Sequence, residues 1–435
     1  MAKPKQLKHE IVTVESDRDR VRLRPTIYTS STGADGCRQV LGEAIDNALD
    51  ELSAQNSVGD TVTVTFDNVT KEYIVEDNGG GIPHDGMLRA VSVLSSSGKY
   101  ENGEESHYLM SSGINGYGAK LGTFLSDYAE YESIQNGESL KYRFEDGLLT
   151  DTKKSKAKGH GTKIKVLLSK RFLDIGHLEF SDIKRDYEEK SYLFPNIHMN
   201  LIHVNKGKEV KKFSYFGKDI LDRVEQWKPD TEVIRVKSKQ VKQVLKNLDD
   251  DKLTDCVILV DLAFGYKEDV LDAANKNDFI ISYANSVHTY SGGTHVDGFY
   301  DGLVKYFRQQ VIPNLKGKDK DLAIIPTDII SGACAFITVK LINPTFEAQF
   351  KSRIINPEVK FAVRDAVYEA LCNEKPATIK QIVDFVKRVT RGRMASKKTR
   401  KKDISNAFSK DRIDKFKDIN YNLETTTPEL ILVEG

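Results

Sequence analysis

Cysteine is scarce in this sequence, and long apolar runs are missing. The four cysteines among 435 residues (Cys37, Cys256, Cys334 and Cys372) are scattered, with no Cys-x-x-Cys pair. This spacing argues against both a disulfide framework and a zinc site. No apolar run approaches the ~20 residues of a membrane span. The first ten residues, MAKPKQLKHE, lack the apolar core of a signal peptide. We therefore expect a cytoplasmic protein with no membrane partner.

The chain also lacks a dominant charge. Its 65 Lys and Arg residues nearly balance 64 Asp and Glu residues, so the net charge of +1 indicates no global affinity for a polyanion. Positive charge gathers in residues 153–163, KKSKAKGHGTK, and in residues 391–402, RGRMASKKTRKK. Such runs are most often solvated faces or loops. The second run follows a helical pattern, however, and a basic helix can track a phosphate backbone.

The first third of the chain mixes helical and strand patterns. Residues 39–53 repeat apolar side chains with a helical period, and residues 61–68 and 161–169 alternate as half-buried strands do. Residues 72–83 read as a short strand running into a Gly/Pro turn. This order predicts an α+β sandwich. It is wrong for a strand–P-loop–helix fold, and no GxxxxGK[ST] motif is present. The apolar stripe of the helix comprises Leu41, Ala44, Ile45, Ala48, Leu49 and Leu52.

Residues 253–345 read as a second α/β unit. The stretches CVILVDLAFGY and ACAFITVKLINP resemble strands, and HVDGFYDGLVKYFRQQVI between them resembles a helix. We expect the boundary between the two units near residue 220.

The helix predicted at residues 39–53 carries a second, acidic stripe opposite the apolar one. Glu43 and Asn47 lie one turn apart on this face. A carboxylate one turn from an amide oxygen suits a hydrated Mg²⁺, and the carboxylate can accept a proton from an attacking water. A solvated acidic helix face is the alternative. The stripe contains Glu43, Asp46, Asn47, Asp50 and Glu51.

Two glycine-rich stretches are candidates for nucleotide contacts. In EDNGGGIP, Asp77 ends a strand and can accept a hydrogen bond from an exocyclic amine, while Gly79 and Gly81 would let a flat ring approach the backbone. An Asx turn closing a hairpin is the alternative. SSGINGYGAKLG, residues 111–122, places Lys120 among four glycines. It suits a phosphate cradle, although ordinary turns also need glycine.

Taken together, GEAIDNALDE, EDNGGGIP, SGINGYGAKLG and GHGTKIKV resemble the four-motif ATP site of the GHKL superfamily. The resemblance implies a Bergerat-type sandwich in which Glu43 is the general base and Asn47 the magnesium ligand. It implies that Asp77 reads adenine with support from the Thr162 hydroxyl. The remaining ATP contacts that it implies are Gly81, Ile82, Tyr108, Ser111, Asn115, Gly116, Tyr117, Gly118, Ala119 and Lys120.

The second half resembles one branch of that superfamily, the type IIA DNA topoisomerases. SYANSVHTYSGGTHVDGF is similar to their transducer signature, and residues 324–354 are similar to the segment that ends in their QTK loop. On this resemblance, Gln349 and Lys351 belong to the catalytic machinery and contact the γ-phosphate, with Phe350 in place of the usual Thr. A cation at the γ-phosphate suits phosphoryl transfer, which relies on positioning and charge neutralisation. The implied transducer has a ribosomal-protein-like βαβ fold.

The resemblance also implies an organisation into four parts. These are an N-terminal strap (1–30), a GHKL ATPase domain (31–220), a transducer domain (221–395), and a basic helix with a linker toward a Toprim domain (396–435). The final LILVEG is similar to the opening of Toprim. We therefore expect a shortened chain or one subunit of a split enzyme, without the cleavage tyrosine and the Toprim carboxylates.

The implied function is the ATP-binding and hydrolysing N-gate of a topoisomerase, with ATP and Mg²⁺ as cofactors. ATP is expected to drive homodimerisation through the strap and capture of duplex DNA, in the cytoplasm or in a eukaryotic nucleus. A MutL-like repair ATPase and a nucleotide-gated DNA clamp with little turnover are the alternatives. One residue departs from the family pattern, because Gly80 stands where DxGRGIP has Arg. That Arg commonly pairs with an acid of the first helix, which leaves the role of Glu51 or Asp50 open.

Overall fold

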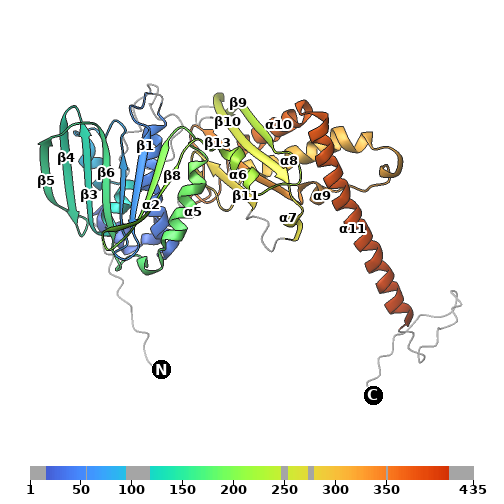
Figure 1. The fold of residues 1–435 in the computed structure, drawn as a ribbon, viewed down its shortest axis with the longest axis horizontal. Helices are drawn as coiled ribbons and strands as arrows, with labels where there is room; N and C mark the ends of the chain where they lie inside the picture. Colours follow the sequence, from blue (N-terminus) through green and yellow to red (C-terminus); the bar gives the residue numbers. More distant parts are fainter. Residues whose placement is uncertain are drawn as a thin grey trace, which may run out of the picture.

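The computed structural model describes residues 16–54, 56–94, 118–245, 253–272, 279–348 and 351–410. These residues form two β-sheets with helices packed against them, followed by a long C-terminal helix that extends away from the body (Figure 1). Within the described ranges, no helix is both long and apolar enough to cross a membrane.

The first sheet has eight strands in the order β5-β4-β3-β6-β2-β1-β7-β8. All neighbouring pairs are antiparallel except β1 and β7, which are parallel. Its strands are β1 (Thr61–Asp67), β2 (Glu72–Asp77), β3 (Ser126–Gln135), β4 (Glu138–Glu145), β5 (Leu148–Lys156), β6 (Gly161–Leu168), β7 (His198–Asn205) and β8 (Lys208–Tyr215). Its helices are α1 (Asp17–Leu23), α2 (Ala34–Leu52), α3 (Met87–Ser92), α4 (Gly118–Phe124) and α5 (Phe180–Ser191).

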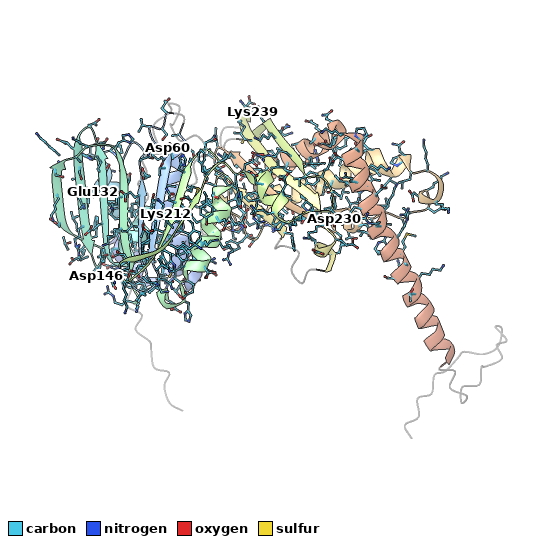
Figure 2. The ribbon with its side chains drawn as sticks, viewed as in Figure 1. Asp60, Glu132, Asp146, Lys212, Asp230 and Lys239 are labelled. Atoms are coloured by element: carbon cyan, nitrogen blue, oxygen red, sulfur yellow. The ribbon has the colours of Figure 1, made fainter. Side chains whose placement is uncertain are left out.

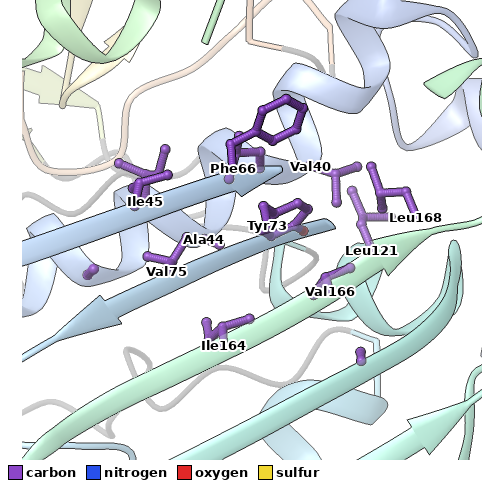
Figure 3. Packing of buried hydrophobic residues seen from close by; sticks show 14 of the residues in the cluster. Val40, Ala44, Ile45, Phe66, Tyr73, Val75, Leu121, Ile164, Val166 and Leu168 are labelled. Atoms are coloured by element: carbon purple, nitrogen blue, oxygen red, sulfur yellow. The ribbon is translucent and has the colours of Figure 1, made fainter. Parts of the chain in front are cut away.

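Helix α2 covers the middle of this sheet because its apolar residues fall on one stripe. All six residues of the predicted stripe are buried in the core cluster of the first sheet. Figure 3 shows two of them, Ala44 and Ile45, among inward-facing side chains of β1, β2 and β6. Strand β1 alternates as expected, with Val62, Val64 and Phe66 fully buried. Helix α2 begins at Ala34, five residues before the predicted start. The packing turns the polar face of α2 away from the sheet, and that face carries Glu43 and Asn47.

The second sheet has five strands in the order β12-β11-β13-β10-β9. Its strands are β9 (Ile234–Leu245), β10 (Leu253–Tyr266), β11 (Ile280–Ala284), β12 (Val287–His288) and β13 (Ala333–Leu341). The predicted strands at the ends of this unit, β10 and β13, are antiparallel neighbours. The βαβ unit instead joins β11 through α8 (Thr294–Tyr306) to the parallel strand β13, and β11 was missing from the prediction.

The remaining helices cover the second sheet or leave it. They are α6 (Ile220–Gln226), α7 (Asp269–Asp272), α9 (Pro326–Ile330), α10 (Pro357–Asn373) and α11 (Pro376–Lys410). Helix α8 packs closely on α10 at Gly298 and Gly302. A Cβ on Gly302, for example, would lie 2.7 Å from Val367. The predicted boundary near residue 220 falls at the start of α6, whose Ile220 and Val224 pack with Ala263 and Phe336 of the second sheet.

Lysines line three of the four sheet edges. Edge strands β5, β8 and β9 carry them on largely exposed surface, and Figure 2 labels Lys212 on β8 and Lys239 on β9. A charged, exposed edge prevents pairing with the strands of another molecule. Protection of an exposed sheet edge therefore explains the lysines that the basic run at residues 153–163 places on β5.

Candidate functional site

The site centres on an ion pair between the two halves of the chain. The Lys351 ammonium group lies 3.2 Å from the Glu43 carboxylate, and the two side chains are 8% and 16% exposed. Burial alone would lower the pKa of Lys351, but the negative charges of Glu43 and Asp46 outweigh it, so the pKa is raised. Lys351 is therefore a buried cation directed at the polar face of α2.

Two further acids of α2 also have partners from other elements. Asp46 is buried and pairs with Lys190 of α5. Burial raises the pKa of Asp46 to about 6 against the opposing effect of Lys190. Glu51 accepts a hydrogen bond of 2.9 Å from the backbone N–H of Gly80. The acidic stripe is thus built into contacts between elements, so it is not simply a solvated helix face.

The same hydrogen bond lies at the position where the pattern DxGRGIP has Arg. Gly80 has no side chain, and its backbone N–H donates to Glu51. The Glu51 side chain packs closely over the turn, since a Cβ on Gly79 would lie 2.5 Å from Glu51 Cγ. In this chain a main-chain hydrogen bond therefore links α2 to the turn after β2.

Asp77 lies half-buried at the end of β2. Its carboxylate accepts hydrogen bonds from the backbone N–H groups of Gly79, at 2.9 Å, and Thr162, at 3.3 Å. Burial raises the pKa of Asp77 to about 6, and these two bonds only partly oppose that effect. The structure thus brings Thr162 to Asp77, opposite it in the β2–β6 register, but the bond comes from the backbone amide and not from the predicted hydroxyl.

Two glycines make the close packing around the Asp77 turn sterically possible. Gly81 has a φ of +81°, and a Cβ there would lie 2.9 Å from the carbonyl oxygen of Ile134. A Cβ on Gly161 would lie 2.1 Å from the carbonyl oxygen of Asp77. Ile82 follows, and its carbonyl oxygen accepts hydrogen bonds from Ser133 and Gln135. The turn after β2 is therefore pinned between β3 and β6.

The described part of the predicted phosphate loop is the start of α4. A Cβ on Gly118 would lie 2.4 Å from Glu43 Oε2, so a side chain at this position would displace that carboxylate. The carbonyl oxygen of Ala119 accepts a hydrogen bond from Tyr131. Lys120 is buried on the same helix. Asn47 lies half-buried on α2, one turn after Glu43.

Several predicted contacts lie outside the described residues. They are Tyr108, Ser111, Asn115, Gly116, Tyr117 and Gln349, together with the first fifteen residues of the predicted strap and residues 411–435. Among the residues that the structure does describe, it brings Glu43, Gly118 and Lys351 to one place and Asp77, Gly81 and Thr162 to another.

Sequence reasoning missed several residues around the site. Lys190 neutralises Asp46 from α5, but nothing in the pattern of an ordinary amphipathic helix indicates that contact. His160 Nδ1 lies 2.9 Å from the carbonyl oxygen of Gly79, which ties the turn before β6 to the Asp77 turn. Its place in GHGTKIKV was the available signal.

The basic run at residues 391–402 belongs to α11. Arg391 pairs with Asp319, and Arg393 pairs with the buried Asp328. Two cations of this run therefore hold α11 against the rest of the domain. The exposed lysines Lys397 and Lys398 follow on the same helix.

Two family models match the chain. The model described as "Histidine kinase-, DNA gyrase B-, and HSP90-like ATPase" matches residues 32–183, and the model described as "DNA gyrase B" matches residues 218–402. The first match contains Glu43, Asp77 and Gly118, and the second contains Lys351. Over these two segments the chain is similar to the ATPase and transducer regions of type IIA topoisomerase B subunits.

Curated relatives align with most of this gyrase B-like chain. The B subunit of the type 2 topoisomerase of Aquifex aeolicus is 26% identical over 413 residues, covering 91% of this chain and 49% of the relative. The B subunit of DNA gyrase from Borreliella burgdorferi is 28% identical over 407 residues, covering 90% and 60%. The B subunit of DNA topoisomerase 4 from Staphylococcus epidermidis is 29% identical over 386 residues, covering 85% and 54%. The chain thus spans about half the length of the relatives it matches.

Solved structures share the fold of the gyrase B-like chain. The 43K ATPase domain of Thermus thermophilus gyrase B, in complex with an aminocoumarin, superposes with a TM-score of 0.59 at 22% identity, covering 89% of this chain and 98% of that one. The ATPase region of Saccharomyces cerevisiae topoisomerase II gives 0.62 at 19% identity, covering 88% and 98%. The expected GHKL sandwich and following transducer domain are confirmed.

Proposed function

We propose that this chain is the ATP-binding and hydrolysing N-gate of a type IIA topoisomerase. The observation that carries the proposal is the 3.2 Å contact between Lys351 and Glu43, because it joins a cation from the second unit to the carboxylate expected to act as base in the first. Phosphoryl transfer needs a positioned water and a positive charge at the phosphate, and these two groups supply both functions. The names of the relatives support the same conclusion.

We assign the residues to steps as follows. Asp77 accepts a hydrogen bond from the exocyclic amine of adenine. Gly81, in the same turn, leaves room for a flat ring. Glu43 accepts a proton from the attacking water, which then adds to the γ-phosphorus as the bond to the β–γ bridging oxygen breaks. Lys351 and Gln349 face the γ-phosphate, and the loop ending in Gly118, Ala119 and Lys120 holds the phosphate chain. Thr162 supports Asp77.

The residues around Asn47 fit a hydrated Mg²⁺. Among the described residues, no group of three His, Cys, Asp or Glu side chains could form a protein cage for a metal ion. An amide oxygen beside a carboxylate suits a magnesium ion that takes its other ligands from water and phosphates. Asn47 would hold the ion, which when bound would neutralise phosphate charge.

The gate itself involves parts of the protein beyond the ATP site. We propose that ATP drives homodimerisation through residues 1–30 and that the closed dimer captures duplex DNA. The ATPase domain would span residues 31–220 and the transducer residues 221–395, with residues 396–435 leading toward a Toprim domain or a separate cleavage subunit. The exposed lysines of α11 are candidates for contact with the DNA backbone.

The test is a steady-state ATPase assay of Glu43→Gln and Lys351→Ala, with and without duplex DNA. Glu43→Gln should bind ATP and dimerise with a non-hydrolysable analogue while losing turnover by about 10²-fold or more. Lys351→Ala should lower turnover with little change in affinity for ATP. Glu225→Gln and Lys318→Ala alter exposed side chains of the same types and are the matched controls.

Two results would count against the proposal. If Glu43→Gln turns over ATP at the wild-type rate, Glu43 is not the general base. If Lys351→Ala shows unchanged turnover, Lys351 does not act on the γ-phosphate. A wild-type chain that binds ATP and dimerises without hydrolysing it would favour the nucleotide-gated clamp.

A further inference from the structure

The segment formed by residues 289–295, TYSGGTH, lies against the chain that follows Lys351. The backbone N–H of Ser291 donates to the carbonyl oxygen of Ser352, and that of Thr294 donates to the carbonyl oxygen of Ile354, both at 3.1 Å. A parallel bridge between Gly293 and Ile354 completes the contact. The first and third residues after Lys351 are therefore fixed by main-chain bonds to the TYSGGTH segment.

Gly293 permits the closest approach in this contact. A Cβ there would lie 2.3 Å from the carbonyl oxygen of Ile354 and 2.8 Å from its nitrogen. Real Cβ atoms do not come so near to backbone atoms, and the φ of +139° is itself unfavourable for any other residue. A side chain at this position would push the chain after Lys351 outward by about 1 Å, the difference between this separation and an ordinary contact.

The TYSGGTH segment is itself held by a buried polar network. His295 Nε2 lies 2.9 Å from Thr289 Oγ1, and the Thr289 hydroxyl donates to the carbonyl oxygen of Ser282 at 2.9 Å. The Ser282 hydroxyl lies 2.7 Å from the same oxygen of Thr289. All three residues are at most 2% exposed. Burial lowers the pKa of His295 to about 3, so the imidazole is neutral and its hydrogen bond does not vary near neutral pH.

Lys351 needs a rigid support of this kind. Its φ is +55°, in the left-handed region that residues other than glycine rarely adopt. Such conformations persist only where the surrounding structure imposes them. Its ammonium group is also buried against α2, so a small shift of the backbone would move the charge relative to Glu43. A hydrogen bond from the Lys351 N–H to the carbonyl oxygen of Ala348 closes the loop on its other side.

We propose that the TYSGGTH segment is the positioning element for the Lys351 ammonium group. Gly293 sets the distance to the chain after Lys351, and Thr289 and His295 anchor the segment to β11. This inference rests on the proposed function, because it concerns how Lys351 is held for ATP hydrolysis. None of these three residues touches the reacting atoms, so they act through Lys351.

The first test compares Gly293→Ala with Gly317→Ala. A 1 Å displacement of a group in the site lowers kcat by about 100-fold, so Gly293→Ala should lose up to this factor while its KM for ATP changes less than about twofold. Gly317 also has a positive φ, +58°, but a Cβ on it would have no atom within 4 Å, and its alanine variant should keep wild-type turnover. Wild-type kcat in a folded Gly293→Ala protein would overturn the proposal.

The second test repeats Gly293→Ala in a Lys351→Ala background. If the glycine acts through Lys351, the double variant should turn over ATP no more slowly than Lys351→Ala alone. An equal fold-loss in both backgrounds would overturn the proposal, because it would mean general damage to the domain. Should Gly293→Ala fail to fold, Thr289→Val removes one hydroxyl without changing the shape of the side chain. It should lower kcat by about tenfold in the wild-type background only.

These outcomes separate the two proposals. If Lys351→Ala hydrolyses ATP as the wild type does, the proposed function fails first. If Lys351→Ala is impaired and Gly293→Ala and Thr289→Val are not, the hydrolytic role of Lys351 stands and the positioning proposal alone is wrong.

Discussion

Replacing Asp77 by asparagine should make the first sheet domain more stable near neutral pH and weaken its hold on ATP. The carboxyl group is half-buried, and desolvation raises its pKa from the ordinary 3.8 to about 6. Asparagine has the same shape and keeps an oxygen that can accept the N–H groups of Gly79 and Thr162. Asparagine cannot ionise, so it avoids placing a charge at this partly desolvated position.

The sign and size of the effect follow from the pKa. The folded protein holds the Asp77 proton more tightly than the unfolded chain does, so the stability from this group is complete below about pH 4. It is lost as the pH rises through about 6. A tenfold change in a protonation equilibrium corresponds to about 1.4 kcal/mol, so the rise to about 6 corresponds to about 3 kcal/mol at pH 8. This is an upper value, because the amide makes weaker hydrogen bonds than the carboxylate.

Thermal unfolding of the two proteins between about pH 4.5 and pH 8 would measure this effect. The melting temperatures should nearly coincide at the acid end and separate as the pH rises, by about 2–4 °C per kcal/mol for a domain of this size. Asp46, whose pKa is also raised to about 6, is present in both proteins and cancels from the difference. A difference that stays constant with pH would refute the reasoning, because the change would then not arise from the charge of Asp77.

Three further predictions concern the same turn. ATP affinity should fall as the pH drops below about 6, because protonation removes the negative charge of the Asp77 carboxylate. A Kd for ATP that calorimetry finds constant over this pH range would contradict the assignment of Asp77 to adenine. Gly81→Ala should lower unfolding free energy by about 2–4 kcal/mol, against about 1 kcal/mol for Gly137→Ala, which shares φ +81° but has an open Cβ position. Gly80→Arg should fold with a melting temperature within about 3 °C of wild type, since the Cβ meets only the far end of the Glu51 side chain at 3.0 Å; a collapsed transition would refute this.

Local patterns predicted the elements that carry the first half of the site. The helical period around Glu43 and the alternation in β1 and β6 arise because each element buries one face, and the structure confirms those faces. The short strand β11 escaped prediction because its five residues lead directly into a turn. Strand β9 escaped because its lysines, at an exposed edge, mask its alternation.

Contacts between distant parts of the chain could not be read from local patterns. The approach of Lys351 to Glu43 was expected only through the family resemblance, since a lone lysine is most often solvated. The hydrogen bond from Gly80 to Glu51 had no signal at all, because the donor is a backbone amide that every residue except proline carries. For the same reason, the hydrogen bond from the Thr162 backbone amide to Asp77 had no signal in the sequence.

The ion pair between Glu43 and Lys351 joins residues 308 positions apart in the chain. During synthesis the helix with Glu43 and the turn with Asp77 leave the ribosome long before the lysine is made, and domains generally fold in that order. A nascent first domain can therefore form the Asp77 turn, the proposed adenine site, while it still lacks the cation. Hydrolysis would begin only when the second sheet has folded and delivered Lys351, so ATP turnover would report that the whole chain has folded.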